Sequence, residues 1–262
     1  MDKYLTSETL PSDWEDNIGN NPYLKKSFLK LIEQIDSSEK SYYVFRNAEG
    51  KIDTQFLISK TSDNDIAMFT PFKLPVILNS VYYPFTLSKP AIILGDQTKK
   101  EAAEFLKNLK GFKLIINTDK FYTLDNFTQG KILPKCMMSI KWNSFEEYIS
   151  SLRSGYRRRY KKALEKSSNL NFYILKNNKK EFSEDMYKLY LDVYNNADYK
   201  LGKVAIDFFK QEDLVIPVLE DKNKELQGFA ALHKNNEELL FEFVGLNKKN
   251  ISQYDIYIRL LL

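Results

Sequence analysis

A short run of basic residues is the part of the sequence that points most directly to chemistry. It extends from Arg153 to Lys166 and holds seven basic residues and one acid, a local charge of +6, whereas the whole chain has a net charge of +4. Four of the six arginines of this lysine-rich chain lie in it. Guanidinium groups bind phosphate or carboxylate through paired hydrogen bonds that lysine does not form. The run therefore predicts a site for an anionic group, and the alternative is an ordinary solvated helix face.

We predict that this run lies on helices. Gly155 is unfavourable inside a helix by about 1 kcal/mol, so we expect it to separate a helix at residues 145–153 from a second helix at residues 156–167. Backbone N–H groups at the start of the second helix would then face an anion held by the arginines. The expected anion-binding residues are Arg153, Tyr156, Arg157, Arg158 and Lys161.

Glu242 lies in the middle of an otherwise apolar strand, which we predict at residues 238–245. Strand alternation places Glu242 on one face and Phe241 and Phe243 on the other. A carboxylate buried without a partner has a raised pKa, which is one way to make a general base that works near neutral pH. The alternative is a carboxylate that faces solvent or pairs with a lysine. Gly245 at the strand end predicts a bulge or a splay that exposes backbone N–H groups.

A single cysteine and a single histidine limit the remaining chemistry. Cys136 alone allows neither a disulfide framework nor a thiolate zinc site, which suits a reducing cytoplasm, and we expect it to be a small buried residue. His233 alone allows no two-histidine metal motif, and we expect it at a surface turn. No glycine-rich nucleotide loop or nucleophile elbow occurs. No apolar run approaches the ~20 residues of a membrane span, and the acidic N-terminus is not a signal peptide.

The order of the predicted elements restarts near residues 126–134, which predicts two halves in a chain of 262 residues, without a residue-level repeat. Tight turns are expected at residues 47–50 and 221–225, and residues 71–86, with three prolines, are expected to form a packed loop or edge. Further helices are predicted at residues 23–35, 98–109, 180–195, 204–211 and from Ser252, and further strands at residues 41–46, 52–60, 65–70, 90–94, 112–117, 135–142, 170–176, 214–220 and 227–233.

The helix that begins near Ser252 carries an amphipathic pattern up to the last residue, with no capping residue after it. Its apolar end at residues 260–262 predicts either further residues in the natural chain or a second subunit that covers this surface. Of the two, we favour further residues.

Several segments of the second half occur in an order that resembles a known family. A strand with Trp142 precedes Phe-Glu-Glu-Tyr at residues 145–148 and the basic residues 153–162; later come Leu-Gln-Gly-Phe-Ala-Ala-Leu at residues 226–232, a strand ending at Gly245 and a helix with two tyrosines. This order resembles the GNAT-type acyltransferase domain of the FemAB-like group, which includes the Fem-type peptidoglycan aminoacyltransferases. The resemblance implies an α/β (α+β) fold with two GNAT-like halves, at residues 1–130 and 135–262, each a mixed, mostly antiparallel sheet flanked by helices.

The resemblance also implies roles for residues near the end of the strand at residues 238–245. That strand would splay from its neighbour, and the N–H groups of Val244, Gly245 and Leu246 would bind the carbonyl oxygen of an acyl donor. Asn247 and Lys248 stand where the family has its pyrophosphate-binding loop, although residues 247–253 contain no glycine. Glu242, or a water that it holds, would deprotonate the acceptor amine.

The expected activity is the transfer of an acyl or aminoacyl group to an amine. The donor would be a small acyl donor such as acyl-CoA, or an aminoacyl-tRNA, and no covalently bound cofactor and no metal are expected. Two alternatives remain open: a non-catalytic module that binds RNA or another polyanion through residues 153–162, and a degenerate scaffold of the same fold.

Overall fold

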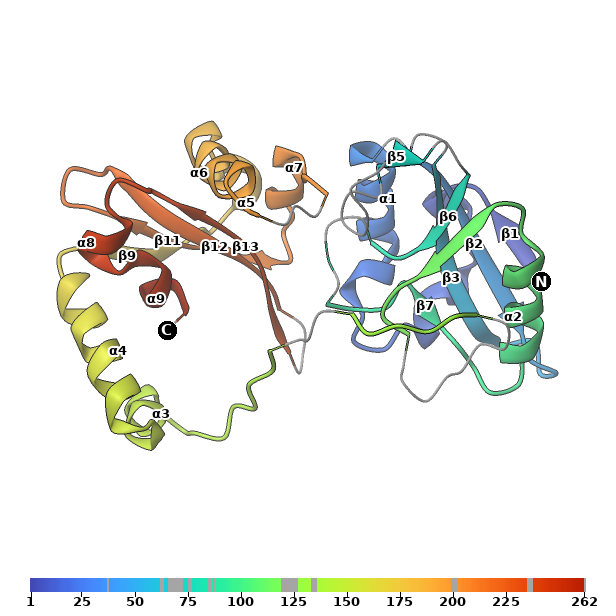
Figure 1. The fold of residues 1–262 in the computed structure, drawn as a ribbon, viewed down its shortest axis with the longest axis horizontal. Coiled ribbons are helices and arrows are strands. Elements are labelled where there is room, and N and C mark those ends of the chain that lie inside the picture. The colour runs from blue at the N-terminus through green and yellow to red at the C-terminus, as the bar shows by residue number, and fades with distance from the viewer. Residues whose placement is uncertain are drawn as a thin grey trace. The chain divides into compact units, whose positions relative to one another are not determined.

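The computed structural model divides the chain into two compact units, each with its own sheet and helices (Figure 1). Unit 1 comprises residues 1–134 and 199–204, and unit 2 comprises residues 135–198 and 205–262. The predicted fold class, α+β with two mixed or antiparallel sheets flanked by helices, is confirmed. The structure describes residues 1–36, 38–61, 64–65, 73–74, 77–83, 86, 88–118, 127–132, 136–198, 202–234 and 238–261.

The sheet of unit 1 has the strand order β1-β2-β3-β6-β8, and the short strand β7 also pairs with β3. Its neighbours are antiparallel except β6 and β8, which run parallel. The two-residue strands β4 (Asn64–Asp65) and β5 (Lys73–Leu74) form a separate ladder. The main strands are β1 (Asp2–Tyr4), β2 (Glu39–Arg46), β3 (Ile52–Thr61), β6 (Leu78–Val81), β7 (Ile92–Ile93) and β8 (Phe112–Ile115).

Helices cover both faces of this sheet because β2 alternates large side chains between them. Tyr43 and Phe45 contact Phe105 of α2 (Lys99–Asn108) on one face. On the other face Tyr42 contacts Trp14, which lies in a 3-10 helix (Ser12–Asn17) before α1 (Lys26–Ile35). The remaining 3-10 helices are Ser7–Thr9 and Pro22–Leu24.

Two expectations for unit 1 have clear outcomes. The turn at residues 47–50 is confirmed, because Gly50 N–H donates to the Asn47 carbonyl and Gly50 has a φ of 79°, which favours glycine. The loop or edge expected at residues 71–86 is wrong for residues 78–81, which form β6 between β3 and β8 with all four side chains buried. Those four residues include no proline, so they can pair on both sides. The strand predicted at residues 65–70 lies mostly outside the described residues.

The sheet of unit 2 is antiparallel throughout. In it β9 pairs with β11, β11 with β12, and β12 with β13, while β10 pairs with the far end of β12. The strands are β9 (Asn171–Ile174), β10 (Leu214–Val215), β11 (Pro217–Glu220), β12 (Leu226–Lys234) and β13 (Leu239–Leu246).

Two groups of helices cover opposite faces of this sheet, which we call the α6 face and the α9 face (Figure 1). On the α6 face, Phe229 and Phe243 pack against aromatic residues of α6 (Glu184–Asn195) and α7 (Ile206–Phe209), with α5 (Asn178–Glu181) beside them. On the α9 face, Ala230 and Leu246 pack with Ile256 and Leu260 of α9 (Ile256–Leu261). The helices α4 (Ser154–Lys166) and α8 (Ile251–Tyr254) contact α9.

The segment before α3 (Phe145–Ser151) departs from the prediction. Residues 136–142 form no strand, and their apolar side chains Met137, Met138 and Ile140 are exposed. Cys136 is also exposed, so the expectation of a buried cysteine is wrong. Apolar content alone suggested a strand here, but a strand requires a partner, and none of the described strands pairs with this segment.

The helices after this segment begin and end for local reasons. Ser144 caps α3, because its Oγ accepts a hydrogen bond from Glu147 N–H at 3.1 Å. The break before α4 falls at Leu152 and Arg153 rather than at Gly155, which lies in the first turn of α4. A first-turn position tolerates glycine better than a helix interior does. None of the helices in the described part of the chain has the length and apolar character needed to cross a membrane.

Candidate functional site

The strand that carries Glu242 contains a bulge at this residue. Along β12 and β13, Ala231 lies opposite Phe243 and Leu232 lies opposite Phe241, so Glu242 has no residue opposite it. A bulge adds one residue to one strand and changes the direction of the side chains next to it. The strict alternation predicted for residues 240–244 is therefore wrong at Glu242, and the bulge predicted near Gly245 lies three residues earlier.

The carboxyl group of Glu242 is enclosed in protein. Its side chain is 3% exposed, and Oε1 has no hydrogen-bond partner among the described residues. The nearest polar group recorded for this oxygen is His233 Nδ1, at 3.8 Å. Burial raises the pKa of Glu242 to about 8, since removal of water disfavours the carboxylate. Of the two interpretations that the sequence left open, the structure has the buried carboxyl group with a raised pKa, whereas its catalytic role stays a prediction.

His233 lies inside β12 and not at a surface turn, so that expectation is wrong. Its side chain is 2% exposed, and the Phe208 ring packs edge-on against the imidazole at a centroid distance of 6.1 Å. His233 Nε2 lies 3.7 Å from Asp213 Oδ2. Burial follows from the pairing of β10, because Leu214 lies directly opposite His233. A strand was expected at residues 214–220, but its pairing with the end of β12 beside His233 was not, which is why His233 was expected at the surface.

The backbone beyond Glu242 presents two amides away from β12. Gly245 lies opposite Phe229, and Asn247 N–H donates to the Gln227 carbonyl at 2.9 Å. Alternate residues of an antiparallel strand bond to the same neighbour, so the N–H groups of Val244 and Leu246 point away from β12, whereas that of Gly245 points toward it. β13 stays paired with β12 to its end, without the expected splay, and pairs with no other described strand.

The loop after β13 is held by its own hydrogen bonds. The Asn247 side chain donates to Glu225 Oε1 at 3.2 Å and accepts from Lys249 N–H at 3.2 Å. Lys248 is exposed beside it. The Asn247 amide is therefore occupied within unit 2, whereas the Lys248 ammonium group is accessible.

The basic residues of α4 form a shallow hollow of about 500 Å³. Arg157 also donates from Nη1 to the Ser150 carbonyl at 2.8 Å, which ties α4 to α3. Arg153 precedes α4 and Tyr156 is 57% exposed, and neither of them lines the hollow. The hollow is lined by Ser154, Arg157, Arg158, Lys161, Lys162 and Glu165, with four cationic groups and one carboxylate.

The hollow and Glu242 lie on opposite faces of the sheet. α4 packs with α8 and α9 on the α9 face, whereas Glu242 joins His233 and the Phe208 ring of α7 on the α6 face. The bulge explains this separation, because it directs Glu242 away from Val244, which packs against the cluster on the α9 face. The arginines therefore do not surround Glu242.

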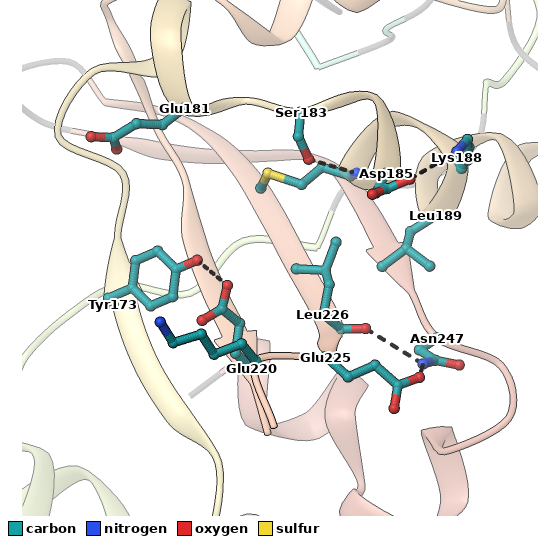
Figure 2. Close-up of a pocket in the computed structure, with 12 residues that line it drawn as sticks. Tyr173, Glu181, Ser183, Asp185, Lys188, Leu189, Glu220, Glu225, Leu226 and Asn247 are labelled. Atoms are coloured by element: carbon teal, nitrogen blue, oxygen red, sulfur yellow. Dashed lines mark hydrogen bonds and ion pairs between the residues drawn. The ribbon is translucent and has the colours of Figure 1, made fainter. Parts of the chain in front are cut away.

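A second pocket, of about 530 Å³, was not expected from the sequence (Figure 2). Tyr173 of β9, Glu220 of β11, the turn at residues 221–225 and the start of α6 line it, together with Asn247. Its carboxylates already have partners: the Tyr173 hydroxyl donates to Glu220 Oε1 at 2.6 Å, and Asp185 pairs with Lys188 at 2.8 Å. Because the lining residues are scattered over the sequence and satisfy one another, no local motif indicated this pocket.

The described residues contain no group of three or more His, Cys, Asp or Glu side chains that could hold a metal ion. The structure thus defines a two-unit α+β protein with a buried acid–imidazole pair in its second sheet.

Comparisons with known proteins show a distant structural likeness. No protein-family model matches the chain, and no curated protein matches it. Among solved structures, it is similar to L-PGS from Bacillus licheniformis, with 12% sequence identity and a TM-score of 0.42, over 88% of this chain and 69% of that one.

Proposed function

We propose that this chain transfers an acyl or aminoacyl group to an amine, and that residues 135–262 form the GNAT-like half that carries the reaction. The observation that carries the proposal is Glu242, a buried carboxyl group whose pKa of about 8 suits a base near neutral pH. It lies two residues before the first of two amides that point away from β12.

In this proposal each group has one task. Glu242, or a water that it holds, takes the proton of the acceptor amine as the nitrogen attacks the carbonyl carbon of the donor. The N–H groups of Val244 and Leu246 donate to the oxyanion that forms, and such donors typically contribute ~3 kcal/mol to the transition state. Gly245 supplies close packing instead, because a Cβ there would collide with the Phe229 ring.

The donor is an acyl-CoA or an aminoacyl-tRNA, both of which carry phosphates. The hollow on α4, with a net charge of +3 from its side chains, suits a phosphate group of the donor or an anionic part of the acceptor. Because α4 covers the α9 face, it would bind a part of the ligand that is remote from the reacting carbonyl. Lys248 would meet phosphate as a single point charge.

Transfer is tested by incubating the full chain with labelled acyl-CoA donors and, separately, with aminoacyl-tRNA, in the presence of a panel of amines. We expect product from one donor class and a loss of at least 100-fold in rate for Glu242→Gln, in line with the usual contribution of a general base. Glu49→Gln is the matched control, since it makes the same chemical change at an exposed turn residue of unit 1. Absence of transfer with every donor would exclude the proposal.

A second candidate function is a non-catalytic module that binds RNA or another polyanion, and the hollow on α4 favours it. This function predicts binding of a single-stranded RNA oligonucleotide, with an affinity that falls steeply as salt rises. Arg158→Ala should weaken binding and reduce the slope of log K against log salt by roughly 1. Arg159→Ala is the matched control, because Arg159 is exposed on the same helix but does not line the hollow. Equal effects of the two substitutions would argue for a diffuse charged face.

A further inference from the structure

Three titratable side chains lie in a row between the surface and the interior of unit 2. Asp213 precedes β10, and its side chain is 37% exposed. His233 of β12 lies behind it, with Nε2 3.7 Å from Asp213 Oδ2. Glu242 of β13 lies behind His233, with Oε1 3.8 Å from Nδ1. The two imidazole nitrogens therefore face different carboxyl groups, one accessible to solvent and one buried.

In the part of the chain that the structure describes, aromatic side chains pack around this row. The Phe208 ring of α7 packs against both His233 and Phe243, the residue that follows Glu242. On α6, the titratable side chain of Tyr190 has its ring against Phe243. Since the side chains of His233 and Glu242 are at most 3% exposed, direct exchange of protons between Glu242 and bulk water is hindered.

We infer that His233 relays protons between Glu242 and Asp213, so that the buried carboxyl group can exchange its proton with solvent through the imidazole ring. The inference deepens the proposed function, and the purpose of the relay rests on that function. His233 would affect the reaction only through the protonation of Glu242, without touching the substrate. The identity of the acyl donor or acceptor plays no part in it.

The proton balance of one passage has three steps. The Glu242 Oε1–H bond breaks as an Nδ1–H bond forms, which gives a carboxylate and an imidazolium. The Nε2–H bond then breaks as Asp213 accepts that proton, which leaves neutral His233 in the other tautomer, and Asp213 passes the proton to water. Transfer in the opposite direction reverses these steps and restores both the first tautomer and the protonated Glu242.

The two distances explain why the relay needs side-chain movement. A hydrogen bond between nitrogen and oxygen spans roughly 2.7–3.2 Å, so each gap must close by about half an ångström or slightly more. Rotation of the His233 ring between its two carboxyl neighbours brings one nitrogen closer at a time, and exposed Asp213 has room to adjust. The relay therefore operates as two alternating contacts around one ring.

The test follows the proton of Glu242 itself. In the full chain, the infrared band of the protonated carboxyl group is monitored after a rapid jump from about two units below to about two units above the Glu242 pKa. Glu242→Gln identifies the band by removing it. We expect His233→Gln to slow the loss of the band at least tenfold, because glutamine keeps polar contacts but does not carry a proton between two sites. Asp213→Asn should also slow it, whereas Asp221→Asn, at the hairpin turn of residues 221–225, should not.

Rates unchanged from wild type in both folded His233→Gln and Asp213→Asn would overturn the relay. If His233→Gln does not fold, the rate of band loss in Asp213→Asn is the deciding measurement. Asp213 is partly exposed and the substitution replaces one oxygen by nitrogen, so this variant is expected to fold. The band reports proton exchange whether or not any acyl donor is turned over. If both variants slow the loss of the band but no acyl transfer is found, only the proposed function is rejected. If acyl transfer is found but neither variant slows the loss of the band, only the relay is rejected.

Discussion

At the scale of single residues, the unusual feature of unit 2 is a carboxyl group, that of Glu242, buried inside the protein. A buried carboxyl group without a hydrogen-bond partner destabilises the fold whenever it is ionised. Glu242 meets this description, with an enclosed side chain and a pKa of about 8. A leucine or glutamine at this position would destabilise the fold less than a buried acid does. This cost is why we propose a functional role for Glu242.

The raised pKa of Glu242 predicts a specific dependence of stability on pH. Because the folded pKa of about 8 lies above the ordinary value of 4.5, the native state binds more protons between these values. The contribution of Glu242 to stability is therefore fully present below about pH 4.5 and is lost as pH rises to about 8. The loss amounts to at most about 5 kcal/mol.

The measurement compares urea unfolding of wild type and Glu242→Gln at several pH values across this range. Since glutamine does not titrate, we expect the stability difference to shift in favour of the variant as pH rises. Glu49→Gln should keep the pH dependence of wild type. A difference between wild type and Glu242→Gln that stays constant with pH would mean that this carboxyl group is not buried in solution.

Residue types and local order predicted part of this site. Glu242 stood out because it is charged within an apolar strand, and of the two environments that this pattern left open, the structure has the buried one. The bulge beside it has no signature in residue types, so the face of the sheet on which Glu242 lies was not predictable. His233 could not be placed because its burial depends on β10, a strand of two residues that pairs across nineteen positions of sequence. The environment of Glu242 therefore required the structure.

At the scale of elements, Gly245 fixes how closely α6 approaches β13. A Cβ on Gly245 would collide with the Phe229 ring and lie 3.0 Å from Leu189 Cβ of α6. The sequence suggested instead that Gly245 marks a bulge or a splay that exposes backbone N–H groups. Its role is steric, because the absence of a side chain lets the helix and the aromatic core pack directly on the strand.

Gly245→Ala should therefore destabilise unit 2 by about 1–3 kcal/mol, the usual cost of excess volume in a packed core. Gly155→Ala is the contrasting variant, because no atom lies within 4 Å of its added Cβ. It should be neutral or stabilise α4 by up to about 1 kcal/mol. The free energy of unfolding of both variants is measured by chemical denaturation. Equal changes in the two variants would contradict the argument that Gly245 is needed for close packing.

The helices and strands that the sequence predicted correctly share a clear local signal. The hairpin turn at residues 221–225 is confirmed by the hydrogen bond from Asp221 N–H to the Glu225 carbonyl, and α3 begins at Phe145, where the sequence predicts a helix to start. The failures at residues 78–81 and 136–142 concern pairing over long distances. At residues 78–81, nearby prolines argued against a strand, although β6 pairs with a strand on each side. At residues 136–142, apolar residues suggested a strand, although none of the described strands pairs with this segment.

At the scale of the whole molecule, each unit has its own sheet and core and contains one of the two tryptophans. Trp14 of unit 1 is fully buried, and its Nε1–H donates to the Leu24 carbonyl at 2.7 Å. Trp142 of unit 2 packs edge-on against Tyr148 at a centroid distance of 4.8 Å. The division into two halves could be predicted because the order of elements restarts, whereas the packing of each core could not.

Fluorescence of the two tryptophans can therefore follow the units separately. If the units unfold independently, Gly245→Ala should lower the denaturant midpoint reported by Trp142 in a Trp14→Phe background. It should leave the midpoint reported by Trp14 in a Trp142→Phe background unchanged. Equal shifts of both midpoints would show that the chain unfolds as one cooperative system.

The exposed position of Cys136 has a practical consequence for anyone who handles this protein. An accessible thiol with no second cysteine in the chain can form a disulfide only with another molecule. Samples stored in air without a reductant are therefore expected to accumulate a covalent species of twice the chain mass, which disappears with dithiothreitol. The same sulfur offers a unique attachment point for a maleimide dye.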